Sequence, residues 1–271
     1  MQPQDFLRAP LGALGTPVCR IGLSASYRPG RETIFKALDE GLNYLFFYGI
    51  DNQMIGVLRD LPPARRSRLV LATGAYNYLI CHQNLRRTLE KRLRQVKTDH
   101  IDLFHFLGVT KPKQLTPQVR DELAAVRASG LVRGVSLSTH DRRFAAQLAR
   151  DGVVDAIMIR YNAAHRGAET EIFPRLAPDA TAVVSYTATR WTALLRRPSG
   201  YPKDGRLPTA GMCYRFVLSN PNVHVCLMAP ANLQQFERNL AEIHRGPLPE
   251  DDLQFLRDFG DVVYRGHKYF M

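Results

Sequence analysis

The fold is decided by residues 98–138, which read TDHIDLFHFLGVTKPKQLTPQVRDELAAVRASGLVRGVSLS. An apolar run at 100–106 is followed by a stretch of helical period near 116–128 and, after Gly130, by a second apolar run at 132–138. Both runs are apolar on both faces, as parallel strands covered by helices are. A glycine just beyond a periodic stretch is a common helix end. This part of the chain therefore predicts one strand–helix–strand unit.

The same alternation extends in both directions. We expect strands at 19–24, 42–47, 68–74, 100–106, 132–138, 155–161, 181–187 and 223–229. We expect helices near 32–40, 51–60, 82–96, 116–128, 142–150, 168–176, 209–218 and 232–244, with one more in the last 20 residues. Eight such units favour closure into a (β/α)8 TIM barrel, an α/β fold that uses about 250 residues as one unit. We predict a single domain over 1–271 with a C-terminal helix.

Two local patterns refine this prediction. No Gly-x-Gly-x-x-Gly follows the first strand, which argues against the open dinucleotide-binding sheet. Residues 196–208, RRPSGYPKDGRLP, combine Gly, Pro and basic residues without apolar periodicity. We expect this segment to be a mobile loop over the barrel mouth.

The composition is that of a basic globular protein. It has 37 Lys and Arg against 25 Asp and Glu, a net charge of +12. This excess favours an anionic ligand, although a solvated basic surface also explains it. We find no nucleic-acid motif, no apolar run long enough to span a membrane, no signal-like N-terminus and no zinc-type cysteine spacing. We therefore predict a cytoplasmic protein without nucleic-acid, membrane or metal partners.

Short motifs in a distinctive order cover nearly the whole chain. They are LGALGTPVCRIGLSAS at 11–26, GLNYLFF at 41–47, TDHIDLF at 98–104, ASGLVRGVS at 128–136, YNAAHRGAE at 161–169, YRFVLSNPNV at 214–223 and QQFERNLAEI at 234–243. In order and spacing they resemble the aldo-keto reductase family, whose members reduce carbonyls with a nicotinamide cofactor. The resemblance implies the barrel and a short N-terminal hairpin before its first strand.

The resemblance fails at most of the family's catalytic positions. The family uses a Tyr acid, a Lys that lowers the pKa of that Tyr, an Asp that holds the Lys, and a His that orients the substrate. Here Phe46 falls on the Asp, Gly74 on the Lys and Leu107 on the His. Tyr48 matches the catalytic Tyr, and packing at the barrel rim is an equal alternative for it. A Tyr without a cationic neighbour is a poor proton donor near neutral pH, so we expect generic aldo-keto reductase activity to be absent or very weak.

A second catalytic candidate is His105, two residues before Leu107. Strand alternation points both side chains to the same face. If that face is the barrel interior, His105 lies one layer deeper than the family's His. A core histidine with one hydrogen bond is the alternative to a catalytic role.

The cofactor positions are also mixed. The resemblance assigns Tyr186 to stacking on nicotinamide, Asn239 to adenine and Ser136 to the carboxamide. Against this, Leu137 and Met158 replace polar family residues, and the phosphate pocket reads Ala229-Pro230-Ala231. The Arg that grips a 2′-phosphate is missing. The predicted cofactor is therefore NADP(H) or none.

Polar residues gather after the later strands, where barrel enzymes keep their functional loops. As catalytic candidates we take His165 and Arg166. As substrate-binding candidates we take Arg160, Tyr161, Asn162, Arg190, Trp191 and His140. Arg binds carboxylates and His moves protons near neutral pH, so we expect both catalytic candidates to face a basic pocket. The alternative is that Arg166 pairs with Glu169 and that Asn162 caps a helix.

Three functions fit these observations. The first is acid–base chemistry of the lyase, dehydratase or isomerase type on an anionic or carbonyl-bearing small molecule, without hydride transfer. The second is an NAD(P)H-dependent oxidoreductase with an atypical proton donor. The third is a non-catalytic ligand-binding barrel.

Overall fold

The structure is a computed structural model that describes residues 6–78, 82–177 and 180–266. Eight parallel strands form a closed barrel in the order β10-β3-β4-β5-β6-β7-β8-β9. They are β3 (Ile21–Ser24), β4 (Tyr44–Phe46), β5 (Val70–Tyr76), β6 (Ile101–Val109), β7 (Val132–Thr139), β8 (Ala156–Arg160), β9 (Ala182–Tyr186) and β10 (Val225–Met228). The predicted (β/α)8 barrel is confirmed.

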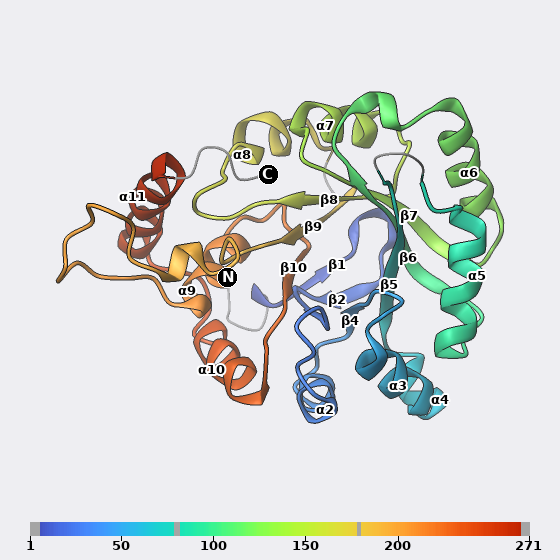
Figure 1. Ribbon diagram of the computed structural model, residues 1–271, viewed down its shortest axis with the longest axis horizontal. Helices are drawn as coiled ribbons and strands as arrows, with labels where there is room; N and C mark the ends of the chain where they lie inside the picture. Colours follow the sequence, from blue (N-terminus) through green and yellow to red (C-terminus); the bar gives the residue numbers. More distant parts are fainter. Residues whose placement is uncertain (1–5, 79–81, 178–179, 267–271) are drawn as a thin grey trace.

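Helices cover the outside of the barrel (Figure 1). They are α2 (Arg31–Asp39), α3 (Asn52–Asp60), α4 (Pro63–Arg66), α5 (Leu85–Val96), α6 (Pro117–Ala128), α7 (Arg142–Arg150), α8 (Ala168–Glu171), α9 (Ala210–Leu218), α10 (Leu233–Ile243) and α11 (Glu250–Gly266), with the 3-10 turns η1 (Gly12–Leu14), η2 (Pro112–Gln114), η3 (Phe173–Arg175) and η4 (Ala193–Leu195). Among the described residues, no helix is long and apolar enough to cross a membrane.

The N-terminal segment forms the hairpin implied by the family resemblance. β1 (Arg8–Pro10) pairs antiparallel with β2 (Pro17–Cys19). Leu11 and Val18 of this hairpin pack with the side chains inside the barrel, so the hairpin closes the end at which the strands begin.

Strand alternation separates two cores. Side chains such as Tyr44, Phe46, Leu103 and Leu107 fill the barrel interior. The intervening side chains, such as Leu45 and Phe104, pack outward against the helices. The interior layer nearest the carboxyl ends of the strands therefore forms the floor of the barrel mouth.

The loop 196–208 packs against α11. The Tyr201 ring lies 5.0 Å from the Phe259 ring, and Arg206 forms an ion pair of 2.7 Å with Asp252. The guanidinium of Arg206 also lies over the Phe255 ring at 4.5 Å. The sequence predicted a mobile loop over the barrel mouth that makes few buried contacts. The contacts of this segment with α11 differ from that prediction. Figure 1 shows the segment extending beside α11.

Candidate functional site

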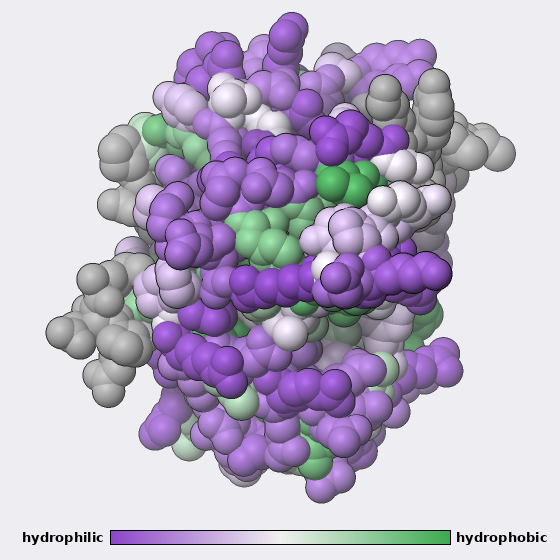
Figure 2. Space-filling model, turned by 90° about the vertical axis from the view of Figure 1, so that its left-hand side faces the viewer, coloured by the Kyte–Doolittle hydropathy of each residue, from purple (hydrophilic) through white to green (hydrophobic). Residues whose placement is uncertain are grey.

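A cavity of ≈ 540 Å³ opens at the carboxyl ends of the strands. Its walls carry aromatic, aliphatic and hydroxyl side chains: Ser24, Ser26, Tyr27, Phe46, Tyr48, Tyr76, Leu107, Gly108, Ser138, Met158, Tyr186, Thr187, Ala188, Thr189, Trp191, Tyr214, Leu227 and Ala229. We call it the mouth cavity. Figure 2 views the molecule from the side that carries α11, and it shows apolar residues near the centre of that face with hydrophilic residues around them. None of the described residues lining this cavity is an Asp, Glu, Lys, Arg or His.

Tyr48 lies in the mouth cavity at the end of β4. Its ring contacts Phe46 edge-on at 5.0 Å and lies 5.6 Å from the Tyr76 ring. The backbone N–H of Tyr48 donates to Asp51 Oδ2 at 2.7 Å, which fixes the loop that carries it. Burial raises the pKa of the Tyr48 hydroxyl well above its usual value, and Tyr76 raises it further. Tyr48 is therefore placed to donate a hydrogen bond to a ligand and is a weak acid.

His105 lies inside the barrel, beneath the mouth cavity. It is completely buried, its ring lies 5.5 Å from that of Phe46, and its Nε2 lies 3.3 Å from the Tyr44 hydroxyl. Burial lowers the pKa of His105 to about 3. Because Phe46 lines the floor above it, His105 does not reach a ligand in the cavity. The position one layer deeper is confirmed, and its surroundings are those of a core histidine.

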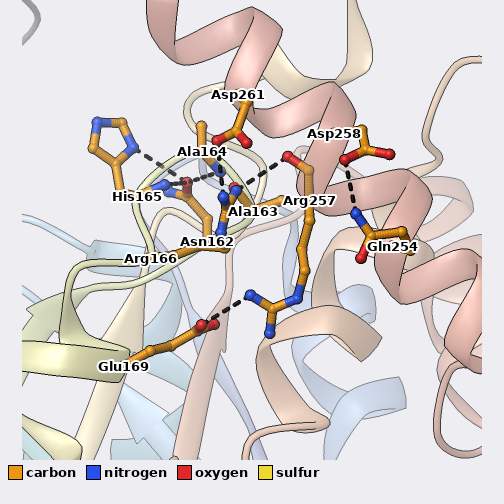
Figure 3. Close-up of polar contacts among 10 residues, drawn as sticks. All are labelled: Asn162, Ala163, Ala164, His165, Arg166, Glu169, Gln254, Arg257, Asp258 and Asp261. Carbon is orange, nitrogen blue, oxygen red and sulfur yellow. Dashed lines mark hydrogen bonds and ion pairs between the residues drawn. The ribbon is translucent and has the colours of Figure 1, made fainter.

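The loop 161–169 follows β8 and forms ion pairs and hydrogen bonds with α11 (Figure 3). Tyr161 donates from its hydroxyl to Glu169 Oε1 at 2.7 Å, and Arg257 of α11 pairs with Glu169 Oε2 at 2.8 Å. Asn162 Oδ1 accepts from the N–H groups of Ala164 and His165, each at 3.0 Å. Asn162 thus caps a turn within the loop, whereas the sequence suggested a helix cap.

Arg166 contacts α11 and does not line the mouth cavity. Its Nη2 lies 2.8 Å from Asp261 Oδ1, and its Nη1 donates to the carbonyl oxygens of Ala163 and Arg257 at 2.5 and 3.1 Å. The suggested pairing of Arg166 with Glu169 is wrong, because each has a partner on α11. The expected position at the mouth is also wrong for Arg166, since its five-donor guanidinium binds backbone and Asp261.

His165 is buried beside α11 rather than in the mouth cavity. Its Nδ1 lies 3.2 Å from Asn162 Oδ1, and its ring meets that of Tyr264 edge-on at 5.5 Å. Burial and the charges of Arg160, Arg190 and Arg142 lower the pKa of His165 to about 3. At neutral pH it is a neutral imidazole. We expected His165 as the acid–base group and Arg166 as the anchor to line one pocket at the mouth. This expectation is wrong, because neither residue lines the mouth cavity.

The remaining substrate-binding candidates divide between the cavity and its surroundings. Trp191 lines the mouth cavity and is 42% exposed. His140 lies behind Tyr186, with ring centres 6.2 Å apart. Arg190 is buried and donates to the Val263 carbonyl of α11 at 2.7 Å. Arg160, at the end of β8, is half-buried. Burial lowers the pKa of His140, and the charge of Arg160 lowers it further. Neither arginine lines the mouth cavity.

We predict that Arg166→Ala loosens α11. Removing the guanidinium leaves Asp261 and two carbonyl groups without it, and a hydrogen bond to a charged group contributes about 1.5–3 kcal/mol when buried. Because both side chains are partly exposed, 23% and 49%, we expect a loss near the lower end of this range. Hydrogen exchange of the α11 amides should become faster, whereas the control Arg143→Ala, at a side chain 89% exposed, should leave it unchanged. Unchanged exchange in Arg166→Ala would contradict the role.

Several lining residues were not among our candidates. Tyr76 follows Gly74 by two residues on β5, and Ser24 ends β3. Strand alternation alone places both on the interior face. Ser138 follows Ser136 by two residues and lines the cavity in its place. The signal was the last inward residue of each strand, whereas most of our substrate-binding candidates came from the loops.

Comparison with known proteins identifies the family. The sequence profile of the aldo/keto reductase family matches residues 32–203. The chain belongs to this family. Two similar solved structures are the holo and apo forms of aldo-keto reductase AKR11C1 from Bacillus halodurans, at 18% and 19% identity. Their TM-scores are 0.74 and 0.72. Each match covers 93% of the present chain and 95% of the chain in the solved structure. No curated protein matches.

The structure shows where the residues lie that the family resemblance sets against the charged catalytic positions. Phe46 and Leu107 line the mouth cavity. Gly74 is buried in β5 opposite His105 of β6, and a Cβ on it would lie 2.2 Å from the His105 carbonyl oxygen. No side chain fits there without a shift of β6. The lysine position is therefore closed by the backbone.

A second cavity of ≈ 350 Å³ adjoins the first, and Thr189, Tyr214 and Ala229 line both. Asn239 lines it as the resemblance implies for the adenine residue, but its amide is buried and lies 3.7 Å from Met228 Sδ. Ser136 is buried inside the barrel, where it pairs with His105 in the sheet register, and lines neither cavity. Of the three cofactor candidates, Tyr186 alone lines the mouth cavity.

The second cavity is a poor fit for the phosphates of a nicotinamide dinucleotide. Its described lining has one cation, Arg238, and one carboxylate, Glu242. Two N–H groups at the start of α10 already have partners, because Ala231 donates to Gln235 Oε1 at 3.0 Å and Gln235 donates to Asn232 Oδ1 at 2.9 Å. Pro230 has no N–H. A phosphate that binds these two N–H groups would therefore have to displace their present contacts.

Proposed function

We propose that this chain is a ligand-binding member of the aldo/keto reductase family that takes a neutral, carbonyl-bearing or hydroxylated small molecule in the mouth cavity and does not perform the family's proton transfer. The observation that carries the proposal is the lining of that cavity. It offers hydroxyl donors and aromatic faces, and none of its described residues ionises near neutral pH. Such a surface binds by burial, stacking and hydrogen bonds.

Acid–base chemistry of the lyase, dehydratase or isomerase type has less support. It requires a group that exchanges protons near neutral pH within reach of the ligand. Tyr48 is in the cavity, but its pKa is raised. His105 lies below the floor, and His165 and Arg166 lie against α11. The expectation of an anionic substrate also loses support, since the arginines that motivated it do not line the mouth cavity.

A second candidate function is an NAD(P)H-dependent oxidoreductase with an atypical proton donor. The observation that favours it is the continuity of the two cavities through Thr189, Tyr214 and Ala229, with Tyr186 in the first and Asn239 in the second. The poor fit of the second cavity to the phosphates of the cofactor argues against it.

Turnover separates these two functions. A panel of aldehydes and ketones is supplied with NADPH or NADH, and loss of the reduced cofactor is followed. We expect no turnover, together with saturable binding of neutral carbonyl compounds by calorimetry. Reduction at about 1 per second or faster, as in working enzymes, would reject the proposal. Absence of binding by any neutral compound would reject it independently.

We further predict that any dinucleotide binding discriminates little between NADPH and NADH. One arginine beside a carboxylate gives the 2′-phosphate little net attraction. The two dissociation constants should differ by less than about tenfold, or about 1.4 kcal/mol. Calorimetric titration of both cofactors measures this. If NADPH binds far more tightly, the prediction fails, and loss of that preference in Arg238→Ala would identify the residue responsible.

A further inference from the structure

The barrel order sets two aromatic walls opposite each other across the mouth cavity. In a closed barrel of eight strands, β5 and β9 are four places apart and therefore face each other. Tyr76 ends β5, and Tyr48 beside it follows β4. Tyr186 ends β9, and Trp191 follows it. All four side chains line the cavity.

The first wall is built from three neighbouring tyrosine rings, one pair tilted and one pair stacked. Tyr48 and Tyr76 lie 5.6 Å apart at 33°, and Tyr78 stacks on Tyr76 at 6.2 Å and 24°. Tyr78 is 52% exposed, so this aromatic surface continues from the cavity to solvent.

Hydroxyl groups occupy the other axis of the mouth. β3 and β7 are also four places apart in the barrel. Ser24 of β3 and the adjacent Ser26 form a hydroxyl pair at 2.7 Å. Ser138 of β7 lies across from them and also lines the cavity. The cavity thus has aromatic faces on one axis and hydroxyl edges on the perpendicular one.

We propose that the mouth cavity is a slot for a planar, uncharged aromatic molecule with hydroxyl or carbonyl groups at two opposite edges, an inference that rests on the proposed ligand-binding function. The two walls stack on the faces of such a molecule. The serine hydroxyls donate to or accept from its edges. An ionised ligand loses its hydration without gaining a charged partner from the described lining. The volume of ≈ 540 Å³ suits a molecule of a few fused rings.

Matched probes test shape and charge separately. They are 2,6-dihydroxynaphthalene, the dianion 2,6-naphthalenedicarboxylate and the puckered decahydronaphthalene-2,6-diol. Calorimetry on the full chain gives the affinities. Trp191 is the single tryptophan and lines the cavity, so its fluorescence reports whether a probe binds there. We expect dihydroxynaphthalene to change that fluorescence saturably and to bind at least about tenfold more tightly than either other probe.

Variants of both walls and one edge complete the test. Trp191→Leu, at an exposed position, and Tyr76→Leu should each weaken dihydroxynaphthalene binding by about fivefold or more. Tyr264→Leu, at an exposed aromatic outside the cavity lining, should leave it unchanged. Ser138→Ala should bring the affinity for dihydroxynaphthalene close to that for 2-naphthol.

The outcomes distinguish a failure of the slot from a failure of the proposed ligand-binding function. Equal affinity for the dianion or for the puckered diol would overturn the slot while leaving ligand binding in place. Unchanged affinity in both wall variants would do the same. If no neutral probe binds at about 1 mM, or if aldehydes are reduced, the proposed function itself is rejected.

Discussion

Replacing Gly74 with lysine, the residue that the family resemblance assigns to this position, is expected to destabilise the barrel severely and to restore no reductase activity. The new Cβ would lie 2.2 Å from the His105 carbonyl oxygen and 3.0 Å from the His105 Cβ. The ammonium group would enter a buried layer beside Phe46, where the family's Asp is missing. Overpacking and an unpaired buried charge together should lower the free energy of unfolding by roughly 3–5 kcal/mol. Urea unfolding measures this loss.

Two variants separate the steric and electrostatic parts of this effect. Gly74→Ala adds the clashing Cβ without the charge and should lose about 1–3 kcal/mol. Leu107→Lys places the same ammonium at a residue that lines the mouth cavity, where the group can reach water, and should lose less than Gly74→Lys. Wild-type stability in Gly74→Lys would show that β6 moves away easily, and the lysine position would then be open.

The fold was predictable because its signals are local. The helix predicted near 142–150 has the bounds of α7, and the structure shows its cap, because Asp141 accepts a hydrogen bond from the Phe144 N–H at 3.0 Å. The single helix expected at 168–176 is α8 followed by η3, because Pro174 at the start of η3 has no N–H to continue the α-helix. The short helix α4 was not predicted, because four residues are too few to show a period.

The site was less predictable because its decisive contacts join distant parts of the chain. Arg166 and Glu169 lie three residues apart, so local pairing was a reasonable expectation. Asp261 and Arg257, which bind them instead, come from α11, nearly one hundred residues later. The opposition of Tyr76 and Tyr186 depends on which strands face each other after closure, and only the barrel order supplies it. By contrast, strand alternation alone was enough to place His105 one layer below Leu107.

Acidification is expected to destabilise the protein through His105. Burial lowers the pKa of His105 to about 3, whereas the unfolded chain holds it near 6.5. Between these values the unfolded state binds the proton and the folded state does not, so stability is present above pH 6.5 and is lost as the pH falls below it. From pH 7 to pH 5, linkage gives a loss of about 2 kcal/mol from this residue. Urea unfolding at several pH values measures the slope.

Comparison of variants shows which residue causes this change of the free energy of unfolding with pH. His165, whose pKa is also lowered to about 3, acts in the same direction. Burial raises the pKa values of Asp51 and Asp102, and these two groups therefore oppose the effect. The prediction is therefore a difference: His105→Leu should reduce the loss between pH 7 and pH 5 by about 2 kcal/mol relative to wild type. The variant also leaves the Tyr44 hydroxyl without its partner, which lowers stability by a similar amount at every pH and does not alter the difference. His244→Leu, at an exposed histidine, should keep the wild-type slope. An unchanged slope in His105→Leu would mean that water reaches His105 and that the floor beneath the mouth cavity is not closed.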